Sequence, residues 1–217
     1  MVQLNKESLA GQIRRELRKR IVNLEINQGE KINVAGLEEE FGVSRAPVRE
    51  ALQSLVDQGL VEVKPRVGYF AVQLTQKQLE DICEMRKLLE THALSKSIYE
   101  IPTSRLEAIR ERSVQLKQNN LSHQELRKQF DETDEELHTT IIEEVDNHIL
   151  KDFTGRIHNF IGLTRHLNER IVAAIDEHLR LIDAIMEDDL EEARSTLSEH
   201  LDSVEQEVIA NHHLQKN

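Results

Sequence analysis

The chain has 217 residues, of which 31% are charged, 38% hydrophobic and only 3% aromatic. This length suffices for two small domains, whose cores must be filled mainly by aliphatic side chains. No apolar run approaches the roughly 20 residues that a membrane-spanning helix needs, and no signal-peptide pattern is present. The lone Cys83 has no partner for an internal disulfide. We therefore expect a cytoplasmic protein that has no membrane partner.

The net charge of −12 is unevenly distributed along the chain. Residues 1–75 hold 11 basic and 10 acidic side chains, and the rest hold 17 and 30, which gives net charges of +1 and −13. The basic residues of the first part gather at 14–20, 45–49 and 64–66. Because phosphate contacts depend on local potential, the first part is compatible with DNA, but the overall acidity excludes a general DNA-coating protein.

Apolar residues at a spacing of four predict a first helix over residues 9–24, with Leu9, Ile13, Leu17 and Ile21 buried together. A short second helix follows over residues 34–41. Gly42 suits its end, because glycine adopts a positive φ at little cost.

A third helix begins after Ser44, whose hydroxyl is expected to cap it, and Val48, Ala51, Leu52 and Leu55 face inward. Arg45 and Arg49 are four residues apart and share its outward side. Two helices joined by a turn, with two arginines at the start of the second, indicate a helix-turn-helix. A guanidinium can bond both acceptors of a guanine, so Arg45 and Arg49 are the expected readers of base edges.

Two β-prone runs, 60–64 and 69–72, flank Pro65-Arg66-Val67-Gly68 and predict a hairpin with a basic tip. The hairpin turns the helix-turn-helix into a winged form. Ser44, Arg66 and Gly68 are expected at phosphates or in the minor groove.

After the short joint at 73–75 the pattern is helical to the C-terminus. Breaks at Pro102 and at several Asn and Asp residues predict six helices, at 76–99, 103–118, 123–145, 147–165, 168–187 and 189–212. The predicted fold is therefore mainly α, with a DNA-binding domain over 1–75 and an all-α bundle over 76–217.

The segments GVSRAPVREAL and GLVEVKPRVGYF resemble the GntR family of bacterial transcription regulators. Together with the six-helix second part, the chain is similar to the FadR branch, with an FCD domain of the VanR-like form. This resemblance implies a homodimeric, non-enzymatic regulator that binds double-stranded operator DNA. Many family members carry an arginine where this chain has Ala35, so the resemblance does not imply that usual operator contact here.

Asp134 and His138 lie four residues apart and point from one helix face, and His178 and His200 lie among apolar residues of later helices. These residues could converge inside a bundle, and they match in order the metal ligands of FCD domains. Imidazole and carboxylate suit a divalent transition metal such as Zn²⁺ or Ni²⁺, one per chain. The remaining histidines have no ligand spacing and are expected to be surface or structural residues.

The resemblance further implies a small carboxylate effector at the metal. Arg86 matches the arginine of the family motif R-x-x-LE, and its guanidinium could clamp the acid, although it could equally form an exposed pair with Glu90. Arg165 is a second candidate for the effector pocket. Two alternatives remain open, namely a metal-responsive regulator and, less favoured, a metal-dependent hydrolase.

Overall fold

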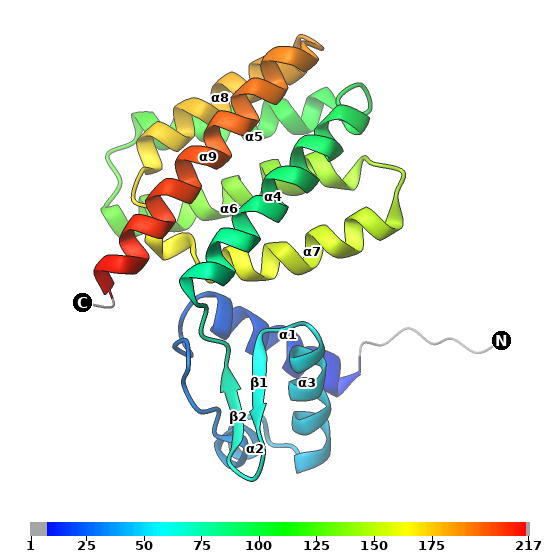
Figure 1. Ribbon diagram of the computed structural model, residues 1–217, viewed down its shortest axis with the longest axis vertical. Helices are drawn as coiled ribbons and strands as arrows, with labels where there is room; N and C mark the ends of the chain where they lie inside the picture. The colour runs from blue at the N-terminus through cyan, green and yellow to red at the C-terminus, as the bar shows by residue number, and fades with distance from the viewer. Residues whose placement is uncertain (1–7, 216–217) are drawn as a thin grey trace, which may run out of the picture. The chain divides into compact units, whose positions relative to one another are not determined.

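The structure is a computed structural model that describes residues 8–215 of the chain. The chain divides into two compact units on either side of the bond between Thr75 and Gln76 (Figure 1). The expectation of a mainly helical protein with an N-terminal winged helix-turn-helix and a helical second part is confirmed. Among the residues described, no helix has the length and apolar character needed to cross a membrane.

From residue 8 onward the first unit consists of three helices and one hairpin: α1 (Leu9–Val22), α2 (Val34–Phe41), α3 (Arg45–Asp57), β1 (Val61–Lys64) and β2 (Gly68–Ala71). The strands pair antiparallel, with Lys64 opposite Gly68. Residues 29–32 run along the other side of β2, where the amide of Ile32 donates to the carbonyl of Tyr69 at 2.9 Å. The wing is thereby fastened to the segment that precedes α2.

The core of the first unit lies where α1 packs against α3. Its fully buried side chains are Ile13, Leu17, Ile21, Val48, Ala51, Leu52 and Leu55. The inward face predicted for α3 is therefore present in full. For α1 the prediction was wrong at Leu9, which is 50% exposed. It is the first helical residue, so only Ala10 of that turn reaches the core.

The turn between α2 and α3 has the predicted backbone but not the predicted cap. Gly42 adopts φ +64°, a left-handed conformation that a side chain would disfavour by about 1–2 kcal/mol. Ser44 occupies the N-cap position of α3 in an extended conformation, yet its hydroxyl makes no capping hydrogen bond. The predicted capping role of this hydroxyl is therefore wrong.

In the second unit the described residues, up to position 215, form six α-helices, namely α4 (Gln76–Ser97), α5 (Thr103–Gln118), α6 (His123–Glu143), α7 (His148–Gly162), α8 (Ile171–Met186) and α9 (Leu190–Gln215). A short 3₁₀ helix, η1 (Arg165–Leu167), joins α7 to α8. The helix predicted over 147–165 is thus too long, and the one predicted from 168 begins at Ile171. The break is stabilised locally, because the hydroxyl of Thr164 bonds the carbonyl of Ile161 and the side chain of Asn168 accepts from the amide of Arg170.

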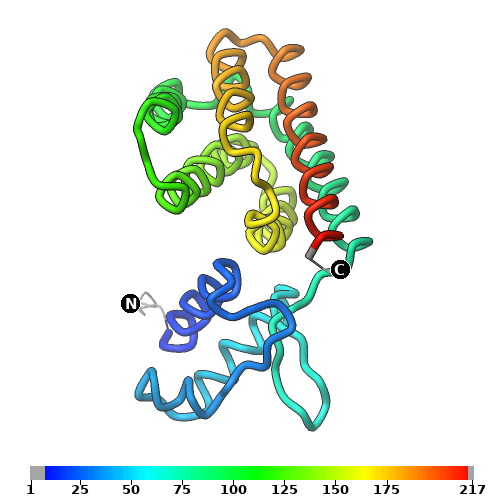
Figure 2. Tube along the Cα trace, turned by 90° about the vertical axis from the view of Figure 1, so that its left-hand side faces the viewer, coloured from blue at the N-terminus to red at the C-terminus, as the bar shows by residue number. Residues whose placement is uncertain are grey.

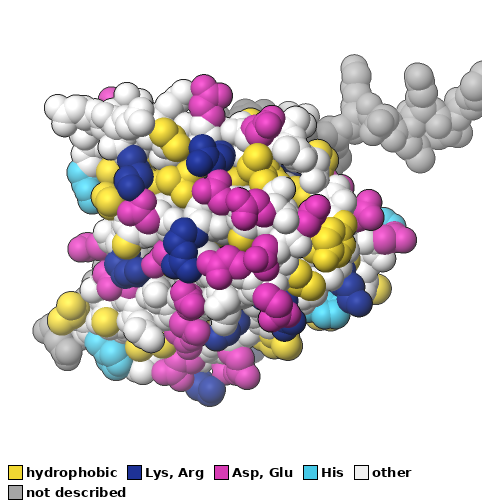
Figure 3. Space-filling model, turned by 90° about the horizontal axis from the view of Figure 1, so that it is seen from above, with side chains coloured by type: hydrophobic (Ala, Val, Ile, Leu, Met, Phe, Trp, Pro, Cys, Tyr) yellow, Lys and Arg dark blue, Asp and Glu magenta, His cyan; other side chains and the backbone are white. Residues whose placement is uncertain are grey.

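Helix α6 is central to this unit, since it packs against α4, α5, α7 and α8. Helices α4 and α9 run side by side along one flank, as Figure 2 shows, and α8 packs against α9. Aliphatic side chains from each of the helices α4 to α9 form the main core, and a smaller cluster surrounds Phe130 of α6. Acidic side chains are abundant on the face seen in Figure 3, as the charge of −13 after residue 75 requires.

Candidate functional site

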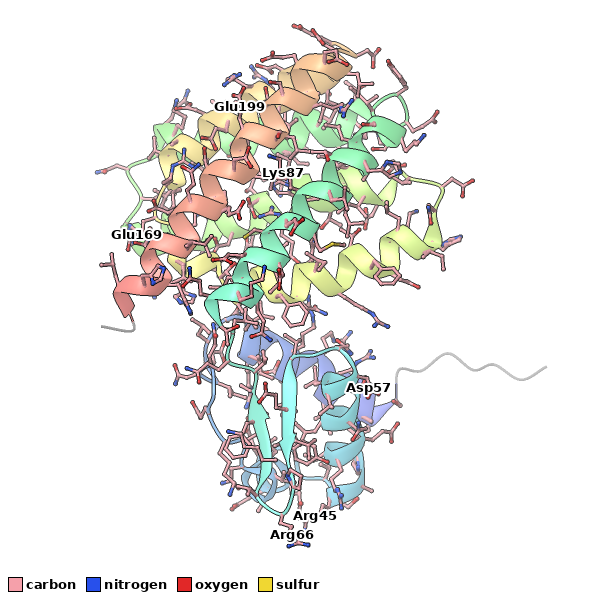
Figure 4. The ribbon with its side chains drawn as sticks, viewed as in Figure 1. Arg45, Asp57, Arg66, Lys87, Glu169 and Glu199 are labelled. Atoms are coloured by element: carbon pink, nitrogen blue, oxygen red, sulfur yellow. The ribbon has the colours of Figure 1, made fainter. Side chains whose placement is uncertain are left out.

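Basic side chains of the first unit surround a groove between α3 and the wing. The groove has a volume of about 660 Å³ and is lined by Lys31, Arg45, Arg49, Lys64, Arg66, Gly68 and neighbouring residues. Figure 4 shows Arg45 and Arg66 close together at one end of the unit, whereas Asp57 lies at the opposite end of α3. The structure thus brings four of the five residues predicted to bind DNA to one groove, and the fifth, Ser44, directly precedes the same helix.

The wing tip has a special backbone at two of its residues. Arg66 adopts φ +65° and Gly68 φ +136°. A Cβ built on Gly68 would lie 3.3 Å from Cε of Lys31, so a larger residue there would push the lysine aside. Lys31 was not among the predicted DNA-binding residues. Its sequence signal is weak, and its place in the groove follows from its bridge to Phe70 beside the wing.

The basic stretch of α1 is not all available for phosphates. Arg20 donates to Glu16 at 2.8 Å and to both oxygens of Glu40, and its guanidinium lies over the ring of Phe41. These hydrogen bonds with Glu40 and Glu16 raise the pKa of Arg20, against a lowering by burial. Arg20 therefore holds α1 against α2, which is a structural role.

In the second unit, one carboxylate and three imidazoles meet between α6, α8 and α9. Asp134, His138, His178 and His200 each offer a ligand atom, and these atoms all lie within 4.8 Å of one another. Oδ1 of Asp134 is 3.6 Å from Nε2 of His138 and 3.5 Å from Nε2 of His178. The Nε2 atoms of His178 and His200 are 3.2 Å apart. Three helices far apart in sequence thus converge as the predicted ligand set requires.

Each imidazole of the cluster is oriented by a neighbour. Nδ1 of His138 lies 2.6 Å from Oε2 of Glu90, and Nδ1 of His200 lies 2.8 Å from Oε2 of Glu177. The ring of Phe130 stacks on His178 with the centroids 5.7 Å apart. In all three rings, Nε2 is directed toward the other members of the cluster.

Burial and neighbouring charges shift the pKa values in this cluster in different directions. Burial disfavours the carboxylate of Asp134, but His138, His178 and Arg86 together hold its pKa well below the usual value. Burial and then the neighbouring His200 hold the pKa of His178 well below its usual value. For His138, burial is outweighed by the charge of Glu90, and the pKa is raised. The cluster therefore combines an ionised carboxylate with at least one neutral imidazole.

These side chains fit a divalent transition metal. Metal–nitrogen and metal–oxygen bonds of about 2.0–2.2 Å place adjacent ligands roughly 3–4 Å apart, and the three spacings of 3.2, 3.5 and 3.6 Å lie in that range. Nε2 of His138 is buried without a hydrogen-bond partner, which a lone pair directed at a metal would explain. Neutral imidazole and carboxylate are ligands that Zn²⁺ and its neighbours prefer.

Arg86 forms a buried ion pair with Glu90. Its Nε donates to Oε1 of Glu90 at 2.9 Å, and the two side chains are 7% and 0% exposed. Of the two expectations for Arg86, the pairing with Glu90 is present, but it is buried and not exposed. His158 of α7 also donates to Glu90 at 3.1 Å, so this histidine has a structural role, one of the two expected for the histidines outside the ligand set.

Arg86 also borders a small cavity next to Asp134. The cavity has a volume of about 20 Å³ and is lined by Arg127, Asp131, Thr164, Arg165 and Asn168, among others. Two guanidiniums in its wall are only loosely neutralised. Arg127 lies 3.9 Å from Asp131 and donates to the carbonyl of Arg165, and Arg165 pairs with the half-exposed Glu135 at 3.1 Å. Arg127 had not been predicted, whereas the structure places both Arg86 and Arg165 at the cavity.

Two family descriptions match the chain. Residues 9–71 match the bacterial regulatory proteins of the gntR family, and residues 81–203 match the FCD domain. The chain is 27% identical to the gluconate operon transcriptional repressor of Bacillus subtilis over 214 residues, 94% of this chain and 87% of that protein.

Solved structures agree with these matches. Escherichia coli McbR/YncC has the same fold with a TM-score of 0.78 at 23% identity, and the match covers 100% of both chains. The Zn²⁺-bound FCD domain of TM0439 matches 64% of this chain and 96% of its own, with a TM-score of 0.56 and 31% identity. A metal-free structure of the same domain matches to a similar extent.

We predict that Asp131→Asn stabilises the metal-free protein above pH 6 and has little effect at pH 4. Burial raises the pKa of Asp131 to about 6, against the opposing effect of Arg165 and Arg127. A carboxyl whose folded pKa is raised stabilises the fold when protonated, and this stability is lost as pH rises from about 4 to 6. After a discount for solvent screening we expect a gain of about 1 kcal/mol, or roughly 2–4 °C in melting temperature at pH 8. Thermal melts of both proteins at the two pH values measure it. A variant that melts below the parent at pH 8 would contradict the assignment.

Proposed function

The chain belongs to the gntR family of bacterial regulatory proteins, and we propose that a divalent metal and a small carboxylate control its binding to operator DNA. As a member of this family with an FCD domain, it is a DNA-binding transcriptional regulator. Its relatives are regulators and not enzymes, which sets the hydrolase alternative aside. The observation that carries the proposal is the convergence of Asp134, His138, His178 and His200 on one point. We place this action in the cytoplasm.

For the DNA interface we propose that Arg45 and Arg49 read base edges from the N-terminal turn of α3. Both are exposed and border the basic groove. The hydroxyl of Ser44, which makes no capping bond, is available for a phosphate. The wing contributes Arg66 and the close backbone approach that Gly68 permits, with Lys31 beside them.

For the second unit we propose one Zn²⁺ or Ni²⁺ per chain, held by the four converging residues. Four protein ligands satisfy a tetrahedral ion, while an octahedral ion would keep two positions for water or an anion. The Zn²⁺-bound structure of the FCD domain of TM0439 supports a metal in this kind of domain. The same likeness is the reason to test Zn²⁺ first.

The effector proposed for this site is a small organic acid. Arg127 and Arg165 stand beside Asp134 with weak or exposed partners, and a bound cation would add positive charge next to them. A cavity of about 20 Å³ holds about one water molecule. An acid therefore has to displace side chains of the cavity wall. Arg127 and Asp131 are the easiest to move, because the ion pair between them is long, at 3.9 Å.

We further propose that the regulator is a homodimer, since two heads must match two operator half-sites. Helices α4 and α7 pack against each other, and both expose large apolar side chains: Met85, Leu88, Ile149 and Phe153. Isolated exposed hydrophobics are common, but four on two adjacent helices favour a second copy of the chain as the partner.

We predict that Arg45→Ala and Arg49→Ala each cost about 1–3 kcal/mol of operator affinity, because each removes a bidentate base contact. Arg66→Ala should weaken binding to all sequences and reduce its salt dependence, since it removes a phosphate contact. Fluorescence anisotropy at several fixed salt concentrations measures both effects. Arg105→Ala, which loses an exposed pair with Glu143 in the second unit, is the control. Unchanged operator affinity in both α3 variants would refute the proposed DNA interface.

We predict one transition-metal ion per purified chain, lost in His200→Ala and retained in His123→Ala, whose histidine is exposed at the start of α6. Zn²⁺ should raise the melting temperature of the wild type and not of His200→Ala, because it binds only the folded cluster. Elemental analysis and thermal melts measure this.

The same melts identify the effector when organic acids are added to Zn²⁺-loaded protein. An acid at about 100 times its Kd contributes about 2.7 kcal/mol, or roughly 5–10 °C, and Arg127→Ala should diminish the shift. Metal content unaffected in His200→Ala would refute the site. If Zn²⁺ alone changes operator affinity and no acid does, the protein is a metal-responsive regulator.

We predict a solution mass of about twice the 25.1 kDa of one chain, and a dimer weakened by Phe153→Glu. Loss of a buried phenylalanine costs about 1.5–3 kcal/mol per copy, and the two copies of a symmetric dimer together give roughly a hundredfold or larger effect. Light scattering over a dilution series measures it. Tyr99→Glu replaces an aromatic residue that is also exposed but follows α4, and should leave the dimer intact. Equal behaviour of the two variants would place the dimer contact elsewhere.

A further inference from the structure

The carboxylate of Glu90 joins three helices of the second unit. It is 0% exposed, and both of its oxygens accept hydrogen bonds from other side chains. Oε1 accepts from Arg86 of α4 at 2.9 Å and from His158 of α7 at 3.1 Å, and Oε2 accepts from Nδ1 of His138 of α6 at 2.6 Å. The shortest of these contacts is the one with a member of the four-residue cluster.

This contact determines which nitrogen of His138 carries a proton. Glu90 pairs with the permanently charged guanidinium of Arg86 at 2.9 Å, so the group is a carboxylate. A carboxylate only accepts hydrogen bonds, so Nδ1 of His138 must be the donor. In the neutral ring the lone pair is then on Nε2, the buried atom without a partner that lies 3.6 Å from Asp134.

We infer that Glu90 is a positioning residue, which fixes the tautomer and ring orientation of His138 toward a divalent metal and holds Arg86 beside the cavity. The inference rests on the proposed metal site and adds to it a residue outside the ligand set. Hydrogen-bond acceptors on the remote nitrogen of a ligating histidine fix its orientation and raise its basicity, and their loss weakens metal binding about 10- to 100-fold.

A purely structural ion pair would explain less of this geometry. Arg86 alone could neutralise Glu90, and apolar residues of the same volume would stabilise the core as well as the pair does. Such a pair needs no contact with His138. Glu177 has the equivalent contact with His200, but it is partly exposed and also bonds Arg170, so it constrains its histidine less tightly.

The first test is the Zn²⁺ affinity of Glu90→Gln, measured in competition with a chromophoric chelator. We expect Zn²⁺ to bind about 10- to 100-fold more weakly than to the wild type. The control is Glu199→Gln, which also removes one negative charge. Glu199 is next to His200 in sequence, but its side chain is 61% exposed on the outside of α9 (Figure 4). Its affinity should stay within about twofold of the wild type, because it contacts no ligand.

Glu90→Gln leaves Arg86 buried without its partner and could fail to fold. The double variant Arg86→Met with Glu90→Gln removes both charges, so it should recover the melting temperature while its Zn²⁺ affinity stays low. A role limited to stability would give the opposite result, with affinity recovering together with stability. Wild-type affinity in either variant overturns the inference.

The second test needs no metal. Long-range ¹H–¹⁵N spectra of histidine-labelled, metal-free protein should show His138 protonated at Nδ1 in the wild type and a mixture of tautomers in the double variant. An Nε2-protonated His138 in the wild type overturns the positioning role. If the wild type does not bind Zn²⁺, both the proposed metal site and the role of Glu90 in metal binding are refuted. If the wild type binds Zn²⁺ and Glu90→Gln binds it equally well, only the present inference fails.

Discussion

Three imidazoles and a carboxylate can be buried at one point of a helical bundle only if each has a polar partner. Asp134 faces two histidines, His138 donates to Glu90 and His200 donates to Glu177. Glu90 is in turn neutralised by Arg86. Removing one member of such a network leaves a neighbour desolvated and unpaired, at a cost of several kcal/mol. The packing of α4, α6, α7, α8 and α9 therefore depends on this network as well as on the apolar core.

The first unit handles its charges in the opposite way. Its core is entirely aliphatic along α1 and α3, and the guanidiniums of Arg45, Arg49 and Arg66 are left in solvent around one groove. Solvated cations cost nothing to maintain, and they release counterions when they meet phosphates. Arg20 shows the difference clearly, because two glutamates already neutralise it and it serves the packing of α1 instead.

Periodicity in the sequence predicted the helices well, because their faces are set by local spacing. The inward face of α3 and the positive φ of Gly42 follow from nearest neighbours along the chain. Helix ends were less predictable. The end of α7 at Gly162 and the exposure of Leu9 depend on contacts that periodicity does not encode, such as the hydrogen bond of Thr164.

In the candidate metal site, too, local spacing was predictable and contacts between distant residues were not. The spacing of Asp134 and His138 indicates a shared face, but the convergence with His178 and His200 was expected mainly from the family resemblance. Glu90 was noticed only as a possible surface partner of Arg86 at i+4. Its contacts with His138 and His158 join residues 48 and 68 positions apart, and they arise only once the helices have packed.

Electrostatics explains why a metal and an acid would be bound together in so acidic a unit. A net charge of −13 after residue 75 repels a small carboxylate at long range, although salt screens this repulsion beyond about 8–10 Å. Close to Asp134 the balance differs, because Arg86, Arg127 and Arg165 surround the cavity and a divalent ion would add two positive charges. Asp134 belongs both to the ligand cluster and to the cavity wall, so the two sites share a residue. If the metal strengthens acid binding by some factor, the acid must strengthen metal binding by the same factor. The acid would then oppose loss of the metal.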